Sequence, residues 1–287
     1  MKLGYCYLCG SKKSHLVHKG TRGGHTTIDV LQCDDCGLVR LSETLADAEA
    51  FYRASGMRDQ LVETPAQTRI GTRADDERRF CRTEAMIEGK RVLDFGCGDG
   101  GYLVRAKIIA RQVVGVELED AMREALCAEG FDVRASIDGL GCFDVITLFH
   151  VIEHLEDPLA YLALFAEHLQ PGGRLVIETP NAEDALLSLY GCGAFADFTY
   201  WHCHVYLYAT ETLKLLAKKA GWQVESFRQV QRYPLVNHLQ WLAKGKPGGH
   251  KTWDFLRDAV LDARYGSLLA ELGIADTLFT VWKRPEA

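Results

Sequence analysis

The stretch from residue 92 to residue 100, Val-Leu-Asp-Phe-Gly-Cys-Gly-Asp-Gly, constrains the fold more than any other part of this sequence. Two apolar residues lead into Asp94, and glycines follow at positions 96, 98 and 100. Glycine adopts positive φ without strain and lets a ligand lie against bare backbone. The pattern therefore predicts a buried strand that ends in a tight turn at a ligand-binding site.

Two classes of ligand fit such a turn. Gly96, Gly98 and Gly101 match the G-x-G-x-x-G pattern of dinucleotide sites, and Glu117 follows at about the expected distance of 20 residues. Asp94 argues against a dinucleotide, because its carboxylate would repel a pyrophosphate bound at the following helix N-terminus. The acid suits a ligand with a cationic amino-acid end, such as S-adenosylmethionine. We therefore predict a methyl-donor site.

Predicted helices and strands alternate after the turn. We expect helices over 102–110 and 158–169 and strands over 112–117, 143–148 and 171–178. This is the spacing of βαβ units, which form a parallel sheet with its ligand at the carboxyl ends of the strands. Glu117 would then accept hydrogen bonds from ribose hydroxyls. The predicted fold class is α/β, with a Rossmann-like sheet.

These motifs resemble the motif series of class I S-adenosylmethionine-dependent methyltransferases. They are Asp94-Phe-Gly-Cys-Gly-Asp-Gly, Glu117, Phe143-Asp-Val-Ile, His150-Val-Ile-Glu-His154, Asp157-Pro158 and Pro171-Gly-Gly. The resemblance implies a seven-stranded sheet whose last strand, over 277–282, runs antiparallel beside 223–227. It also implies donor contacts from Asp94, Phe95, Gly96, Cys97, Gly98, Glu117, Leu118, Ser136, Ile137 and His150.

Two identical knuckles, Cys6-x-x-Cys9-Gly and Cys33-x-x-Cys36-Gly, mark the N-terminal region. Four thiolates in paired C-x-x-C turns fit tetrahedral zinc, and four ligands close its coordination shell. A segment of about forty residues buries little core alone, so a metal would add stability. Disulfides or a redox pair are the alternatives, but six further cysteines without a pairing pattern are typical of a reducing compartment. We predict a structural zinc ribbon.

The expected organisation has three parts. Residues 1–45 form the ribbon, 46–88 a helical linker or cap over the donor site, and 89–287 the methyltransferase domain with a helical insertion at 231–273. A helix is expected over 253–265. Mixed charges between Arg69 and Arg91 predict a solvated helix face.

Composition and charge argue against membranes and nucleic acid as binding partners. No run of apolar residues approaches the 18 or so that a membrane helix needs, and no signal-peptide core precedes the first knuckle. We therefore expect a cytoplasmic protein that does not bind membranes. The net charge of −6 has the wrong sign for steering toward phosphate backbones, so we expect no nucleic-acid partner. The oligomeric state is left open.

The knuckles and the aromatic pair Phe51-Tyr52 resemble methyltransferases of deoxysugar, polysaccharide and natural-product pathways. The resemblance implies a small-molecule acceptor, with O-, N- and C-methylation all open. Methyl transfer needs a positioned acceptor and, for a hydroxyl or carbon acid, a base. In the sugar enzymes that the chain resembles, a His followed by aromatics acts near the acceptor, and this resemblance points to His204, with Tyr200, as the base. We expect His202 and His154 to line the same pocket.

A metal-assisted alternative concerns His150-Val-Ile-Glu153-His154. Ubiquinone-pathway O-methyltransferases and small-RNA 2′-O-methyltransferases carry Glu-x-x-Glu-His at this place, where it holds a divalent metal against acceptor hydroxyls. Here His150 replaces the first Glu, which favours a softer metal or none. The simpler hypothesis is that Glu153 and His154 cap and orient the loop.

Two further functions stay open at this stage. The chain could methylate RNA or protein through its ribbon, or it could bind the donor without catalysis. The acidity and the aromatic-histidine segment favour the small-molecule enzyme over the first, and the intact glycine and acid motifs argue against the second.

Overall fold

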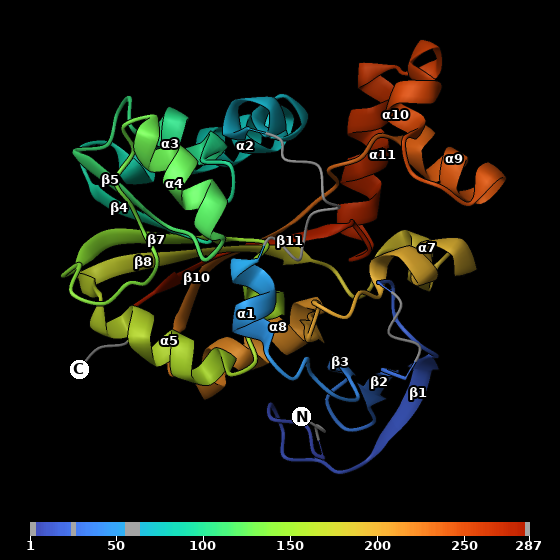
Figure 1. Cartoon of the computed structure of the whole chain (residues 1–287). Coiled ribbons are helices and arrows are strands. Elements are labelled where there is room, and N and C mark those ends of the chain that lie inside the picture. The colour runs from blue at the N-terminus through green and yellow to red at the C-terminus, as the bar shows by residue number, and fades with distance from the viewer. Residues whose placement is uncertain (1–3, 24–26, 55–63, 285–287) are drawn as a thin grey trace. The chain divides into compact units, whose positions relative to one another are not determined.

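The computed structural model describes residues 4–23, 27–54 and 64–284 (Figure 1). Its strands form a four-stranded sheet, ordered β1-β2-β3-β9, and a seven-stranded sheet, ordered β10-β11-β8-β7-β4-β5-β6. The residues divide into two compact units. The first unit comprises 1–45, 152–156 and 178–280, and the second comprises 46–151, 157–177 and 281–287.

The second unit carries the parallel strands. These are β4 (Arg91–Phe95), β5 (Gln112–Val116), β6 (Val133–Arg134), β7 (Phe143–Phe149) and most of β8 (Leu169–Pro180). Its helices are α1 (Ala48–Arg53), α2 (Pro65–Ile87), α3 (Gly101–Ala106), α4 (Asp120–Ala128) and α5 (Pro158–Glu167). Strand β4 pairs in parallel with β5 on one side and β7 on the other, which makes it the centre of this part of the sheet.

Apolar packing on both faces holds this sheet. Helices α3 and α4 cover one face and α5 the other (Figure 1). On the first face, Leu103, Leu126 and Val133 pack in one buried cluster. On the other, the ring of Phe95 lies 5.0 Å from that of Phe165. A parallel sheet covered on both faces needs near-continuous apolar strands, as β4 and β7 have.

The first unit contains the N-terminal ribbon and the C-terminal helices. The ribbon strands are β1 (Ser14–His18), β2 (Val30–Cys33) and β3 (Val39–Leu41), and they pair antiparallel. Its other elements are η1 (Ile152–His154), α6 (Ala185–Ser188), α7 (Gly193–Thr199), β9 (Tyr206–Leu207), α8 (Thr210–Lys219), β10 (Gln223–Val230), α9 (Leu235–Lys244), α10 (Gly249–Thr252), η2 (Asp254–Leu256), α11 (Ala259–Glu271) and the first part of β11 (Thr277–Lys283). No helix of the described residues is long and apolar enough to cross a bilayer.

The predicted fold class is confirmed. The backbone N–H of Asn181 donates to the carbonyl of Asp276, and that of Arg284 donates to the carbonyl of Gly173. Residue numbers therefore rise along β11 as they fall along β8, so β11 runs antiparallel as expected.

Two predicted helix boundaries are wrong. The helix expected over 102–110 ends at Ala106, because the N–H groups of Ile108 and Ile109 bond three residues back and tighten the chain into a turn. The helix expected over 253–265 begins at Ala259 instead. There Asp258 accepts a hydrogen bond from the N–H of Leu261 and caps the first turn.

The buried β11 offers a test of the packing. Trp282 is fully buried, so Trp282→Ala should lower the free energy of unfolding by about 3–5 kcal/mol, the usual loss for deleting a large core side chain. Phe255 is 81% exposed, so the control Phe255→Ala should stay within about 0.5 kcal/mol of the wild type. Denaturant unfolding measures both. Equal effects of the two changes would contradict the packing of β11.

Candidate active site

The glycine turn after β4 has the backbone that the sequence predicts. Gly96, Gly98 and Gly100 have φ values of 76°, 53° and 73°. A Cβ on Gly96 would lie 2.5 Å from a methyl carbon of Val151, so the loop after β7 packs directly on this backbone. A Cβ on Gly98 would meet nothing within 4 Å. Gly98 therefore faces open space, where a ligand can approach the backbone.

Asp94 lies at the end of β4 and is only 2% exposed. Its Oδ1 accepts a hydrogen bond of 2.7 Å from the hydroxyl of Thr147 on β7. Burial raises the pKa of Asp94 to about 7, although the Thr147 bond and the charge of Arg79 oppose the rise. A cation that arrives at this carboxyl would therefore favour its ionised form.

Glu117 follows β5 and is held against the glycine turn. Its Oε2 accepts from the backbone N–H of Gly98 and its Oε1 from that of Glu119, both at 2.8 Å. These two bonds orient the carboxylate beside the turn. The turn, the acid at its base and this second acid suit S-adenosylmethionine. The ribose contact of Glu117 stays a prediction.

Other predicted donor residues have mainly structural contacts. The ring of Phe95 packs on Phe165, and Cys97 is buried in the cluster of Leu103 and Leu126, where burial raises the pKa of its thiol well above the usual value. Their backbone belongs to the turn, and any donor contact through it stays a prediction.

Four more predicted donor residues lie on loops that follow strands. The hydroxyl of Ser136 donates to Asp138, and Ile137 is buried, while Leu118 is half-buried after β5. His150 follows β7 with a φ of 58° and is the one non-glycine residue with positive φ in the described ranges. Such backbone strain is typical of functional loops.

Helix α2 brings buried polar side chains to the glycine turn, and the sequence pattern did not predict them. The Thr72 hydroxyl lies 3.0 Å from Asp76 Oδ2 and 2.9 Å from Asp99 Oδ2. Asp76 is 4% exposed, and burial together with the charge of Asp99 raises its pKa. The prediction of a solvated helix face is therefore wrong for this side of α2. The signal was present, since Thr72, Asp76, Arg79 and Thr83 recur at helical spacing.

A second polar group, in the first unit, joins Glu153, His154 and His204. Glu153 is fully buried and accepts a hydrogen bond of 2.9 Å from the hydroxyl of Thr179. The rings of His154 and His204 lie 5.0 Å apart, centre to centre. The structure thus brings together two of the four predicted catalytic residues with a buried acid.

Backbone carbonyls select the tautomer of both histidines. His154 Nδ1 lies 2.8 Å from the carbonyl oxygen of Cys203, and His204 Nδ1 lies 3.2 Å from that of Thr199. A carbonyl only accepts, so each Nδ1 carries the proton. Each neutral ring therefore presents a basic Nε2, which can take a proton or bind a metal.

The same three residues could together bind a cation. One ligand atom from each of Glu153, His154 and His204 lies within 4.8 Å of the others. His150 is not a member of this group, so the triplet considered from the sequence is replaced by one that includes His204. A carboxylate and two imidazoles, each held by a second hydrogen bond, suit a divalent transition metal.

The other two predicted catalytic residues contact the ribbon. Tyr200 is 6% exposed and packs in an apolar cluster with Val30 and Leu41. His202 Nδ1 lies 2.8 Å from the carbonyl oxygen of Arg22. That Tyr200 and His202 line the acceptor pocket remains a prediction.

The four knuckle cysteines come together in the ribbon. Cys6 Sγ lies 3.6 Å from Cys36 Sγ, Cys9 Sγ lies 3.5 Å from Cys33 Sγ, and all four atoms lie within 4.8 Å of one another. Zinc–sulfur bonds of about 2.3 Å in a tetrahedron require sulfur–sulfur distances of about 3.8 Å, so the thiols fit such an ion. Burial raises the pKa of Cys33, but hydrogen bonds from the N–H groups of Cys36 and Asp35, together with those from the thiols of Cys9 and Cys36, lower it to about 7.

Comparison with known proteins decides the family. A family model described as a methyltransferase domain matches residues 67–226, more than half of the 287-residue chain. The chain belongs to this family. It is an S-adenosylmethionine-dependent methyltransferase, as the resemblance of its motifs implied.

Curated relatives share the name ubiquinone biosynthesis O-methyltransferase. The protein of Thiobacillus denitrificans is 28% identical over 55% of this chain and 75% of its own length. That of Nitrosococcus oceani is 32% identical over 36% of this chain and 48% of its own length. The methyltransferase thus spans about half the length of several of the relatives that it matches.

A solved structure supports the fold. The crystal structure of a SAM-dependent methyltransferase from Archaeoglobus fulgidus superposes with a TM-score of 0.50 at 24% identity. The match covers 72% of this chain and 92% of that protein.

The raised pKa of Asp94 predicts pH-dependent donor binding. A cationic donor binds the ionised carboxylate, so below about pH 7 its affinity should fall by up to about tenfold per pH unit. Asp94→Asn should bind S-adenosylmethionine more weakly and lose this slope. The control Asp132→Asn, at a half-exposed carboxylate, should keep it. Calorimetric titration at several pH values measures the three proteins. An unchanged slope in Asp94→Asn would contradict this role.

Proposed function

We propose that this methyltransferase transfers a methyl group to a hydroxyl of a small molecule, such as a sugar, a nucleotide-sugar or a natural-product intermediate. The names of the curated relatives favour oxygen as the acceptor atom. The net charge of −6 favours a small acceptor over a phosphate backbone. The pairing of His154 and His204 beside Glu153 carries the proposal, because it supplies the base that a hydroxyl acceptor needs.

S-adenosylmethionine, when bound, supplies a methyl group already activated by its sulfonium. The chain must hold the acceptor hydroxyl and receive its proton. His204 Nε2 is the proposed base, since its Nδ1 proton is engaged by the Thr199 carbonyl. The resulting imidazolium would be stabilised by the negative charge of Glu153, which lies in the same group. His154 would orient the acceptor through its own Nε2.

The same group supports a second mechanism for this reaction. A divalent cation on Glu153, His154 and His204 would lower the pKa of the acceptor hydroxyl. The two mechanisms respond differently to metal. After chelation, add-back of Mn²⁺ or Mg²⁺, which do not suit the four thiolates of the ribbon, would restore turnover only in the metal-assisted case. Zn²⁺ is not used here, because it would also refill the ribbon.

A panel of acceptors tests the function. The purified chain, given donor with a deuterated methyl group, should label phenols, sugars or nucleotide-sugars, detected by mass spectrometry. Parallel reactions contain RNA and unfolded protein. Label in RNA or protein, and in no small molecule, would instead favour an enzyme that methylates macromolecules through its ribbon.

His204→Ala tests the proposed base. Turnover of the acceptor that the panel returns should fall by about a hundredfold or more, the usual size of a general-base effect, while donor affinity stays near that of the wild type. The control His168→Ala removes a histidine whose Nδ1 bonds to the carbonyl of Leu164 at the end of α5, and it should retain turnover. Loss of thermal stability without loss of rate in His204→Ala would indicate a packing role instead.

We also propose that the ribbon holds one structural zinc on Cys6, Cys9, Cys33 and Cys36. The sulfur positions fit a tetrahedral ion, and four thiolates leave no open coordination position.

Elemental analysis tests the zinc. Cys33→Ser should lose the metal and lower the melting temperature, because metal binding and folding of such a small unit are coupled. Cys81→Ser, at an exposed thiol of α2, is the control and should keep one zinc per chain. Full occupancy in Cys33→Ser would contradict the proposed ligands.

A further inference from the structure

The ribbon is joined by backbone hydrogen bonds to the segment that carries His204. Strand β3 pairs with β9, with Val39 opposite Leu207. At the other end of the segment, Arg22 forms a bridge with Trp201, and its N–H donates to the carbonyl of Tyr200 at 2.8 Å. The segment from 200 to 207 is therefore tied to the ribbon both before and after His204.

Arg22 adds a side-chain clamp to these bonds. Its guanidinium carbon lies 4.4 Å from the ring centre of Phe198 and 4.6 Å from that of Trp201. Both distances are within the range of cation–π attraction. The planar cation thus contacts two aromatic rings that flank the turn, and it restricts the rotation of Trp201.

The ring of Trp201 in turn packs against both histidines. Its ring centre lies 5.6 Å from that of His204 and 6.3 Å from that of His154, both in edge-on contact. The bond from His204 Nδ1 to the Thr199 carbonyl measures 3.2 Å, at the long end of the range for N–H···O hydrogen bonds. Packing by Trp201, beside that by His154, limits the orientation of the His204 ring.

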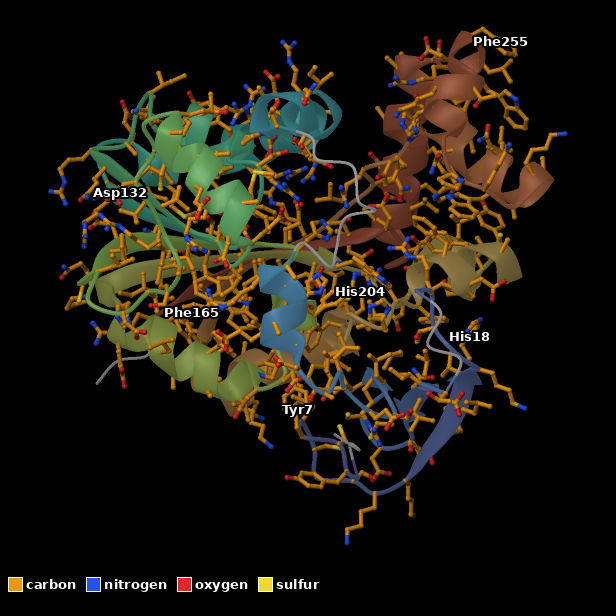
Figure 2. The ribbon with its side chains drawn as sticks, viewed as in Figure 1. Tyr7, His18, Asp132, Phe165, His204 and Phe255 are labelled. Atoms are coloured by element: carbon orange, nitrogen blue, oxygen red, sulfur yellow. The ribbon has the colours of Figure 1, made fainter. Side chains whose placement is uncertain are left out.

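The backbone beside Arg22 leaves little room for adjustment. Gly23 has a φ of 98°, and a Cβ at this position would lie 2.3 Å from the ring of His202. The ring of His202 is in turn bonded to the Arg22 carbonyl. The ribbon therefore contacts the histidine segment closely enough that a single methyl group would displace one of them. Figure 2 labels His18 on the ribbon and His204 on this segment.

We propose that Arg22 is a positioning residue for methyl transfer: through Trp201 it holds His204 Nε2 in the orientation that accepts the proton. The inference rests on the proposed function of His204. It assigns the ribbon a part in catalysis through contacts within the chain, in addition to any role as a metal-stabilised appendage. A guanidinium suits this role better than an ammonium, because its plane can contact two rings at once.

The test measures the histidine directly and needs no acceptor. Diethyl pyrocarbonate modifies the neutral imidazole nitrogen, and peptide mass spectrometry reports its rate at each histidine of the full chain. In Arg22→Met, which keeps the stem and loses the cation, His204 should react severalfold faster because Trp201 no longer restrains it. Arg22→Lys should restore part of the protection. Donor affinity should not change in either variant.

Two controls separate positioning from general stability. Lys12→Met removes an exposed ribbon cation and should leave the His204 rate unchanged. His15, exposed on β1, serves as the internal reference within each variant. If Arg22→Met folds poorly, Phe198→Leu removes one ring of the same clamp and should give the same selective increase.

Several results would overturn the proposal. One is a wild-type rate at His204 in both Arg22→Met and Phe198→Leu. Another is an equal acceleration at His204 and His15, which would show that Arg22 contributes only to overall stability. If the selective increase is found but the acceptor panel shows no small-molecule methylation, the positioning stands and the proposed acceptor class fails. The two hypotheses are thus distinguishable.

Discussion

The register of the central parallel strands is the constraint on which the donor site depends. Asp94 on β4 is paired with Gly115 on β5 and with Thr147 on β7. Because the three strands are aligned at these residues, the turns that follow them emerge at one edge of the sheet. The alignment brings the Thr147 hydroxyl to the Asp94 carboxyl and Glu117 to the N–H of Gly98. A one-residue slip would point alternate side chains to the opposite face and remove both contacts.

Burial of acids is the energetic cost of these sites. Burial raises the pKa of Asp94 at the glycine turn to about 7. A carboxyl with a raised pKa binds its proton more tightly in the folded chain than in the unfolded one. Its contribution to stability is therefore present below the unfolded value near 4 and is lost as the pH rises toward 7. Near pH 7 an ionised Asp94 therefore lowers the stability of the folded chain. A cationic ligand bound at Asp94 would offset this loss.

The histidine group in the first unit depends on backbone carbonyls and on the ribbon. The carbonyls of Cys203 and Thr199 decide which nitrogen of His154 and His204 carries the proton. The segment that supplies both carbonyls is bonded to the ribbon through β3, β9 and Arg22. A small module with two cysteine knuckles thus takes part in the geometry of a group that lies far from it in sequence.

The sequence by itself determined the fold class, the glycine turn and the two knuckles, because each rests on local chemistry. Positive φ demands glycine, alternating apolar segments demand a covered sheet, and paired C-x-x-C turns gather thiols whatever surrounds them. The positions of Asp94 and Glu117 at the ends of strands were predictable for the same reason, since strand ends follow from the apolar pattern.

Only the tertiary structure decided what depends on contacts distant in sequence. It buried Asp76, although local charge indicated solvent, because that face of α2 packs on the glycine turn. It replaced His150 by His204 in the acid–histidine group, and it placed Tyr200 and His202 against the ribbon. No spacing rule in the sequence encodes these contacts, since residues as distant as 22 and 202 meet only when the chain has folded.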